Sequence, residues 1–159
     1  MDTTKKTIIV FSGDLDKALA AFIIATGAAA GGDEVTMFFT FWGLNILRRP
    51  EKIKAGKKSM LQGMFGRMMP RGPQKLGLSK MNFAGMGAPL MKIVMKQQNI
   101  MPLDELVASA KEQGVRFVAC TQTMDMMGFK KEELMDGLEY EGVSSYLATA
   151  EEASINLFI

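Results

Sequence analysis

Short apolar runs rich in β-branched residues alternate with helical patterns at both ends of the chain. Residues 6–12 (KTIIVFS) and 34–41 (EVTMFFTF) are two such runs, and an alanine-rich helical pattern over 15–30 separates them. Gly31-Gly32 ends the helical pattern. Because both runs are apolar without alternation, they are typical of parallel strands that are buried on both faces. The first forty residues therefore predict a βαβ unit.

The same alternation returns in the last third of the sequence. A helical pattern over 103–113 precedes a third apolar run, 115–120 (VRFVAC), and a short helix is expected over 121–127. Residues 138–141 and 155–159 read as two further strands, around a helix at 143–152. Strands that alternate with helices predict an α/β fold of one domain, residues 1–159, with a mostly parallel sheet of about five strands covered on both faces.

Residues 44–100 interrupt this pattern. Glycine and proline punctuate the segment, nine of the fifteen methionines lie between Met60 and Met101, and Pro50 breaks a helical pattern over 45–58. A short helix is expected at 90–98. We predict a helical, Met-rich insertion at about 44–100, either as a lid of short helices or as an adaptable contact surface. The methionine cluster has three interpretations: it fills core space, it forms a partner surface, or it binds copper(I). The irregular spacing of the methionines argues against copper(I) binding.

Charge is distributed unevenly along the chain. The net charge is only +2, but residues 48–96 contain twelve basic residues and one acid, Glu51. This asymmetry indicates either an anionic or acidic partner or a solvated, lysine-rich face. Lys92 and Lys96 lie on a basic amphipathic piece that suits a partner groove or, less favoured, a membrane surface. The basic segment has few aromatic residues and no recognised module, which disfavours nucleic-acid binding.

Several residue types are missing, and this narrows the chemistry. The sequence contains no histidine, which excludes Ser-His-Asp and Cys-His mechanisms and His-based zinc sites. One cysteine cannot form an internal disulfide, which favours a reducing compartment such as the cytoplasm. There is no signal-peptide pattern at the start and no apolar run of about 18 residues. No Gly-x-Gly-x-x-Gly follows the first run, which disfavours a nucleotide site, and thiol exchange needs no metal, so no cofactor or metal is predicted.

The candidate site lies where the predicted strands end, since parallel sheets bind ligands beyond the carboxyl ends of their strands. The residues at these exits are Ser12, Gly13, Trp42, Gly43, Cys120, Thr121 and Gln122. Cys120 precedes a predicted helix, whose free amides favour a thiolate; the alternative is a buried, inert cysteine. Trp42 either lines the mouth of the site or is a core tryptophan. Ser12-Gly13-Asp14 binds a phosphate or, in the favoured interpretation, forms a simple turn and helix cap.

Three segments resemble the DsrE/DsrF-like sulfur-relay family, in its sulfurtransferase or peroxiredoxin-like branch. They are residues 8–14, 38–44 (FFTFWGL) and 119–128 (ACTQTMDMMG), and the end of the chain from 142 also fits. The resemblance implies a flavodoxin-like sheet, a homo-oligomer and a sulfurtransferase whose cysteine accepts sulfane sulfur and passes it to a partner thiol. Cys120 occupies that position.

The family also implies the kind of partner, namely sulfur-donor and sulfur-acceptor proteins such as a TusA-like carrier or a rhodanese-like protein. A lone cysteine suits relay better than internal disulfide catalysis, because the chain has no resolving thiol. The alternative hypothesis is a non-catalytic subunit that binds a partner through the basic, Met-rich insertion.

Overall fold

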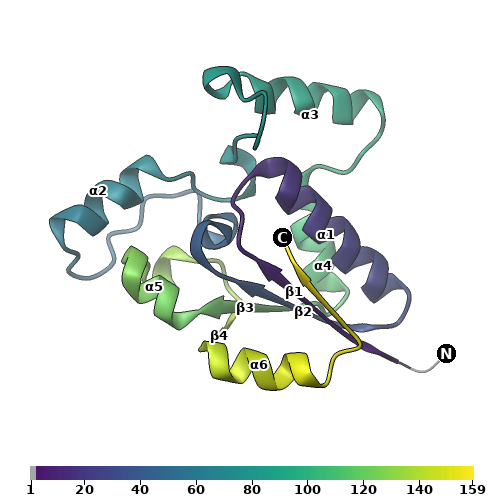
Figure 1. The fold of residues 1–159 in the computed structure, drawn as a ribbon. Helices are drawn as coiled ribbons and strands as arrows, with labels where there is room; N and C mark the ends of the chain where they lie inside the picture. Colours follow the sequence, from purple (N-terminus) through teal and green to yellow (C-terminus); the bar gives the residue numbers. More distant parts are fainter. Residues whose placement is uncertain (1–2) are drawn as a thin grey trace.

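Five strands form one parallel sheet in the computed structural model, which describes residues 3–159. The strands are β1 (Lys5–Val10), β2 (Glu34–Phe39), β3 (Arg116–Cys120), β4 (Glu139–Glu141) and β5 (Ile155–Phe158). Their order is β4-β3-β2-β1-β5, and every pairing in it is parallel (Figure 1). The chain therefore adds β2, β3 and β4 on one side of β1 and then returns to place β5 on the other side.

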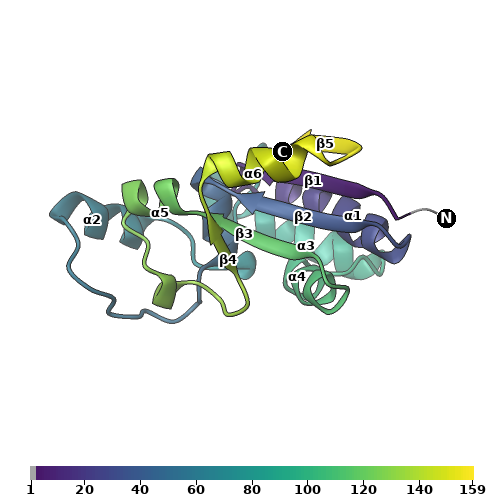
Figure 2. The ribbon, with the colours of Figure 1, turned by 90° about the horizontal axis from the view of Figure 1, so that it is seen from below.

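Helices cover both faces of this sheet (Figure 2). The α-helices are α1 (Leu15–Ala30), α2 (Met60–Met68), α3 (Gly87–Gln97), α4 (Leu103–Glu112), α5 (Thr121–Met127) and α6 (Val143–Glu151). Helices α1 and α4 lie side by side on one face, and α6 covers the other. Short 3₁₀ helices are η1 (Phe41–Leu47), η2 (Pro73–Lys75), η3 (Phe83–Gly85) and η4 (Lys131–Glu133).

Alternation along the strands divides the core into two clusters. In β3, Phe117 and Ala119 join the larger cluster on the α1 and α4 face, whereas Val118 and Cys120 join a smaller cluster with Tyr146 of α6. Both faces are buried, which confirms the predicted α/β class with a five-stranded parallel sheet. The direction in which strands are added reverses at the connection from β4 to β5, which crosses the sheet from one edge to the other. The strand order therefore differs from the 2-1-3-4-5 order of flavodoxin, although the layers are the same.

Outside residues 44–100, the predicted strands and helices are confirmed, and most of their boundaries differ from the predicted ones by no more than two residues. Strand β1 stops earlier, at Val10 rather than at residue 12, because the chain turns toward α1. Helix α1 ends where expected, and Gly32 adopts a left-handed φ of 93° just beyond it. The expected helical turn over 130–136 is the short η4.

Residues 40–102 consist of short helices joined by irregular chain. The helix considered for 45–58 is wrong: η1 ends at Leu47, before Pro50, and α2 begins only at Met60. Helix α2 starts with a capping box, in which the Ser59 hydroxyl accepts from the Gln62 amide and the Gln62 side chain accepts from the Ser59 amide. The short helix expected at 90–98 is α3, which begins slightly earlier.

Arg48 anchors this segment to the body of the protein. Its guanidinium is almost fully buried and donates to the carbonyls of Gly66, Met69 and Pro70, which orders the end of α2. It also lies over the Phe129 ring, 4.7 Å from the centroid. Burial, helped by the positive charge of Arg71 and opposed by Glu133, lowers the pKa of Arg48 from its ordinary value to about 10. The carbonyls therefore compensate part of the cost of burying the charge.

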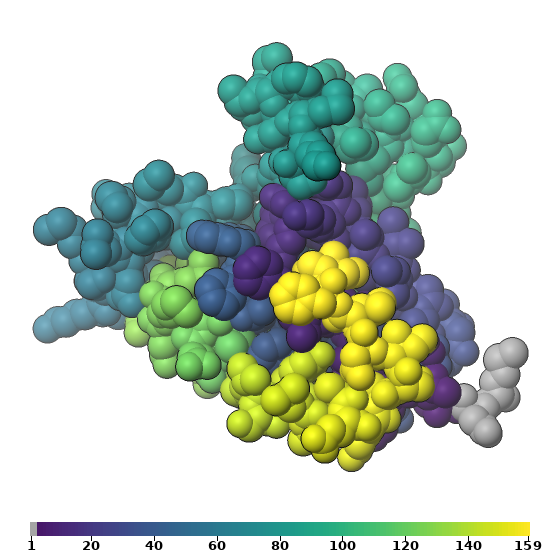
Figure 3. Space-filling model, viewed as in Figure 1, coloured from purple at the N-terminus to yellow at the C-terminus, as the bar shows by residue number. Residues whose placement is uncertain are grey.

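Helices α2 and α3 expose much of their apolar surface. Met60 is 90% exposed and Met68 is 75% exposed, and Leu61, Met64 and Phe65 of α2 are also exposed. Figure 3 shows the chain around α2 and around α3 as two lobes that stand out from the body. Within residues 3–159, no helix has both the length and the apolar character that a membrane span requires.

Candidate functional site

Cys120 is the last residue of β3 and lies at the carboxyl end of the sheet, as predicted. It pairs in register with Glu141, the last residue of β4. The connection that leaves β3 passes through α5, beyond the ends of the strands, and runs outward to β4, whereas the connection that leaves β4 passes through α6 and runs back across the sheet to β5 (Figure 2). Neighbouring strands whose exits diverge in this way border the crevice where α/β proteins bind ligands.

The Cys120 side chain is buried, with 2% of the residue exposed. It packs with Phe38, Val118 and Tyr146 beneath α6. The Tyr146 ring stacks on Phe38 at 4.6 Å, and its hydroxyl lies 3.0 Å from the Thr7 hydroxyl. The sulfur is therefore reached only when part of this cover moves.

A pair of threonine hydroxyls contacts the sulfur. The Thr123 hydroxyl donates to Cys120 Sγ at 3.3 Å and lies 2.8 Å from the Thr40 hydroxyl. A hydroxyl has one proton, so Thr40 is the donor in the second bond. The two bonds form a short polar chain from the sulfur to the exit of β2, where Thr40 is partly exposed.

Thr121 and Gln122 begin α5 directly after the cysteine. The Thr121 hydroxyl donates to the carbonyl of Glu141 at 3.4 Å, which ties the exits of β3 and β4 together. Gln122 is exposed. Helix α5 is seven residues long and ends at Gly128, whose left-handed φ of 72° closes it as expected.

The other four predicted residues form a separate group at the exits of β1 and β2. A Cβ on Gly43 would lie 2.0 Å from the Val10 carbonyl oxygen, and one on Gly13 would lie 2.5 Å from the Trp42 carbonyl oxygen. The two exits cross so closely that both positions require glycine. Trp42 is 46% exposed, so its interpretation as a core tryptophan is wrong.

Ser12 forms a local turn at the same exits. Its hydroxyl accepts from the Asp14 amide at 3.1 Å, which fits the turn interpretation of Ser12-Gly13-Asp14. Although Asp14 precedes α1, its side chain makes no capping bond. In residues 3–159, no hydrogen bond joins this group to Cys120.

Thr40 and Thr123 are the site residues that the sequence analysis missed. Thr123 lies three residues after Cys120, so it faces back toward the strand end once α5 forms. That spacing is a usable signal. The contact with Thr40 depends on the pairing of β2 with β3 and has no local signal.

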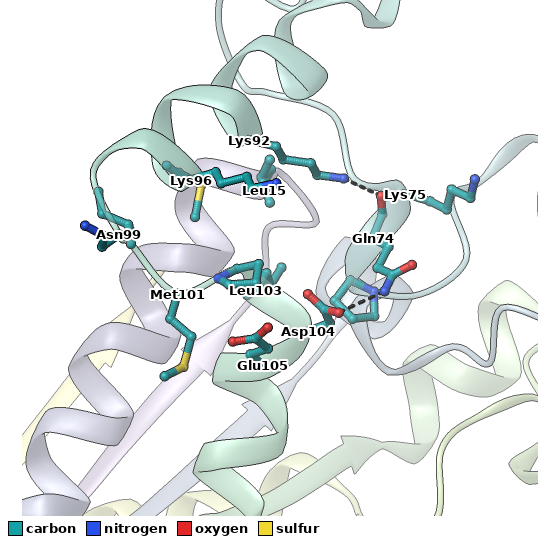
Figure 4. A pocket seen from close by; sticks show the side chains of 14 residues that line it. Leu15, Gln74, Lys75, Lys92, Lys96, Asn99, Met101, Leu103, Asp104 and Glu105 are labelled. Atoms are coloured by element: carbon teal, nitrogen blue, oxygen red, sulfur yellow. Dashed lines mark hydrogen bonds between the residues drawn. The ribbon is translucent and has the colours of Figure 1, made fainter.

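A separate cavity of about 730 Å³ lies between α3, η2 and the start of α4 (Figure 4). Lys92 and Lys96 of α3 border it from one side and Asp104 and Glu105 of α4 from the other, whereas the amine of Lys75 on η2 points away from it (Figure 4). None of the predicted site residues lines it. In the described part of the chain, no group of three or more His, Cys, Asp or Glu side chains is arranged to hold a metal ion.

Comparison with solved structures identifies proteins with the same fold. The chain superimposes on MTH1491 of Methanobacterium thermoautotrophicum, a protein of unknown function, with a TM-score of 0.57 and 16% identity, covering 98% of this chain and 99% of that one. It superimposes on the ychN protein of E. coli with a TM-score of 0.58 and 10% identity over the full length of both. At these identities, the similarity shows the fold alone.

Sequence comparison gives a more specific relationship. The chain is 59% identical over 157 residues to the uncharacterized protein YrkE of Bacillus subtilis, covering 99% of this chain and 98% of YrkE. It is 36% identical, over an alignment of 163 positions that spans the full length of both chains, to the sulfur carrier protein DsrE2 of Allochromatium vinosum. The model of the DsrE/DsrF/DrsH-like family matches residues 3–158. The chain therefore belongs to the DsrE/DsrF/DrsH-like family.

Proposed function

We propose that this protein is a sulfur carrier or sulfurtransferase that holds sulfane sulfur as a persulfide on Cys120 and passes it to a partner thiol. Membership of the family, together with 36% identity to a sulfur carrier protein, supports a role in sulfur relay. The observation that carries the assignment to this residue is the position of the chain's one thiol, at the carboxyl end of β3 with a hydroxyl donating to its sulfur.

The reaction consists of two exchange steps. The Cys120 thiolate attacks the outer sulfur of a donor persulfide, R–S–SH; the S–S bond of the donor breaks, and RS⁻ leaves with the electron pair. Cys120 then carries –S–SH. The thiolate of an acceptor attacks the outer sulfur, the acceptor becomes the persulfide, and Cys120 leaves as the thiolate. No net oxidation or reduction occurs, so no additional redox partner is needed.

The Thr123 hydroxyl serves both steps in this proposal. A thiolate accepts a hydrogen bond more strongly than a thiol does, so the Thr123 donor favours the attacking form and later the leaving form of Cys120. Thr40 holds the Thr123 hydroxyl in this orientation. Burial of the sulfur excludes water and bulk thiols from the persulfide between the two steps.

A two-step transfer experiment tests the proposal. The protein is incubated with a persulfide donor, freed of donor by gel filtration and then mixed with a thiol acceptor, with intact mass measured after each step. We expect a gain of about 32 Da, one sulfur atom, followed by its loss to the acceptor. Cys120→Ser is the control. Equal loading of wild type and Cys120→Ser contradicts the proposal.

The proposal includes partners, an assembly and a location. Donor and acceptor proteins of the TusA-like or rhodanese-like kind supply and receive the sulfur. Strand β5 is an edge strand with Phe158 exposed, which supports self-association into a homo-oligomer. A single unpaired thiol suits the reducing cytoplasm, where we place the protein.

The second candidate function is a non-catalytic subunit that binds a partner through residues 44–100. The exposed apolar side chains of α2, next to exposed basic residues such as Lys54, Lys57 and Arg67, favour it. In this case, partner capture survives Cys120→Ser and is lost after charge reversal within 48–58 at the exposed Lys54 and Lys57, with the structural Arg48 and Lys58 left unchanged. The opposite pattern favours the sulfur carrier.

A further inference from the structure

Helix α5, which begins at the thiol, is held at its other end by α2. The Gln62 side-chain amide donates to the Asp125 carbonyl of α5 at 3.0 Å. A Cβ on Gly128, the residue that closes α5, would lie 2.7 Å from the Gln62 Cβ, so the glutamine packs directly against the end of the helix. One side chain of α2 therefore contacts both the last turn and the terminus of α5.

Gln62 is itself held in place from both sides. Its carbonyl oxygen accepts from the Ser59 amide at 3.1 Å as part of the capping box of α2, which leaves its NH₂ group directed at α5. Helix α2 is fixed at its start, because Lys58 pairs with the buried Glu133 of η4 at 2.6 Å. Arg48 fixes its end through the Gly66 carbonyl.

The first turn of α5 contacts the sulfur through Thr123, and Tyr146 of α6 packs in the same buried cluster as Cys120. The two covers differ in how firmly they are held. Tyr146 is buried, stacked on Phe38 and bonded to Thr7. Helix α5 has only seven residues, of which Thr123 and Met124 are buried, and its bond to Gln62 is solvent-exposed; short segments with exposed bonds open at a lower free-energy cost than the core.

We propose that Gln62 is a positioning residue that latches α5 over Cys120, and that the thiol becomes accessible when α5 lifts from α2. This inference rests on the proposed function, because it concerns how donor and acceptor reach the same sulfur. In the latched state, Thr123 touches the sulfur and the persulfide is protected. In the open state, the end of β3 is exposed to a partner thiol.

Alkylation of Cys120 by iodoacetamide under native conditions measures this access. Gln62→Glu keeps the side-chain length and the oxygen that accepts from Ser59, but it replaces the donor to Asp125 with a second oxygen. Gln62→Met removes the donor without adding charge. We expect both variants to raise the alkylation rate about three- to tenfold at fixed pH. The rate follows the population of the open state, and loss of one such hydrogen bond raises the opening equilibrium constant by about this factor. Hydrogen exchange of the α5 amides should accelerate in parallel.

Two variants serve as controls. Gln98→Glu makes the same charge change at an exposed position after α3 and should leave the alkylation rate unchanged. Tyr146→Phe removes the bond to Thr7 and loosens the α6 cover instead. If both Gln62 variants are alkylated at the wild-type rate, the latch proposal is overturned. It is also overturned if Tyr146→Phe raises the alkylation rate of Cys120 and the Gln62 variants do not. Access is measured on protein without added sulfur and needs no sulfur loading, so failure of the latch is distinguishable from failure of sulfur loading.

Discussion

Gly43→Ala tests the close crossing of the exits of β1 and β2, which sets the shape of the sheet edge beside the thiol. The added Cβ would lie 2.0 Å from the Val10 carbonyl oxygen, whereas ordinary contacts begin at 3.4 Å. The backbone must move by more than an ångström, and the bond from the Gly43 amide to the Phe11 carbonyl, now 2.9 Å, is strained or lost. Overpacking of this kind, together with one hydrogen bond, costs about 3 kcal/mol.

Urea and thermal unfolding followed by circular dichroism measure this cost. A loss of about 3 kcal/mol lowers the Tm by roughly 6–12 °C in a chain of this length. Gly27→Ala is the matched control, because Gly27 lies inside α1 with no atom within 4 Å of the added Cβ. It should stabilise the protein by about 0.5–1 kcal/mol. A Gly43→Ala protein within about 0.5 kcal/mol of wild type refutes the described crossing.

Three further predictions follow from single contacts. Arg48→Met should lower the free energy of unfolding by about 2–4 kcal/mol in urea titrations, since three carbonyls lose a charged donor; an unchanged midpoint contradicts this. Burial raises the pKa of Asp16, but hydrogen bonds from Ser79 and from its own amide, together with the charge of Lys17, outweigh burial, so the pKa lies below its ordinary 3.8. Asp16→Asn should therefore lower the free energy of unfolding at neutral pH. This difference from wild type should disappear as the pH falls below 3.8 and through the lowered pKa; a difference in unfolding free energy that persists in acid contradicts the prediction. Thr123→Val should slow sulfur loading of Cys120 roughly three- to tenfold in timed mass spectra. If the variant loads sulfur at the wild-type rate, the Thr123 hydroxyl has no role in the reaction.

The sheet and the position of the thiol could be predicted because their signals are local. Apolar runs such as 115–120 indicate buried parallel strands whatever their neighbours are, and a helix pattern directly after Cys120 places it at a strand end. The glycines that end α1 and α5 act through their own backbone conformation, so Gly32 and Gly128 were equally readable.

The cover of the thiol could not be predicted, since it depends on contacts between distant residues. Thr40 meets Thr123 only because β2 pairs with β3, and Gln62 meets Asp125 only because α2 folds back onto α5. Helix α2 itself had a local signal, the capping box Ser59-x-x-Gln62, which the surrounding glycines and methionines obscured. Trp42 follows an apolar strand and resembles a core residue in sequence, but the crossing at Gly43 turns it outward.

Sulfur relay by this protein requires that sulfur bonds to Cys120, which is buried in the resting protein. The most direct measurement is fragmentation mass spectrometry of the intact protein after exposure to a persulfide donor, under native conditions and without reductant. We predict that the added sulfur, about 32 Da, is confined to fragments that contain Cys120 and is released by a reducing thiol. Protein that stays at its unmodified mass, or that carries the same increment in the Cys120→Ser variant, would contradict the central claim.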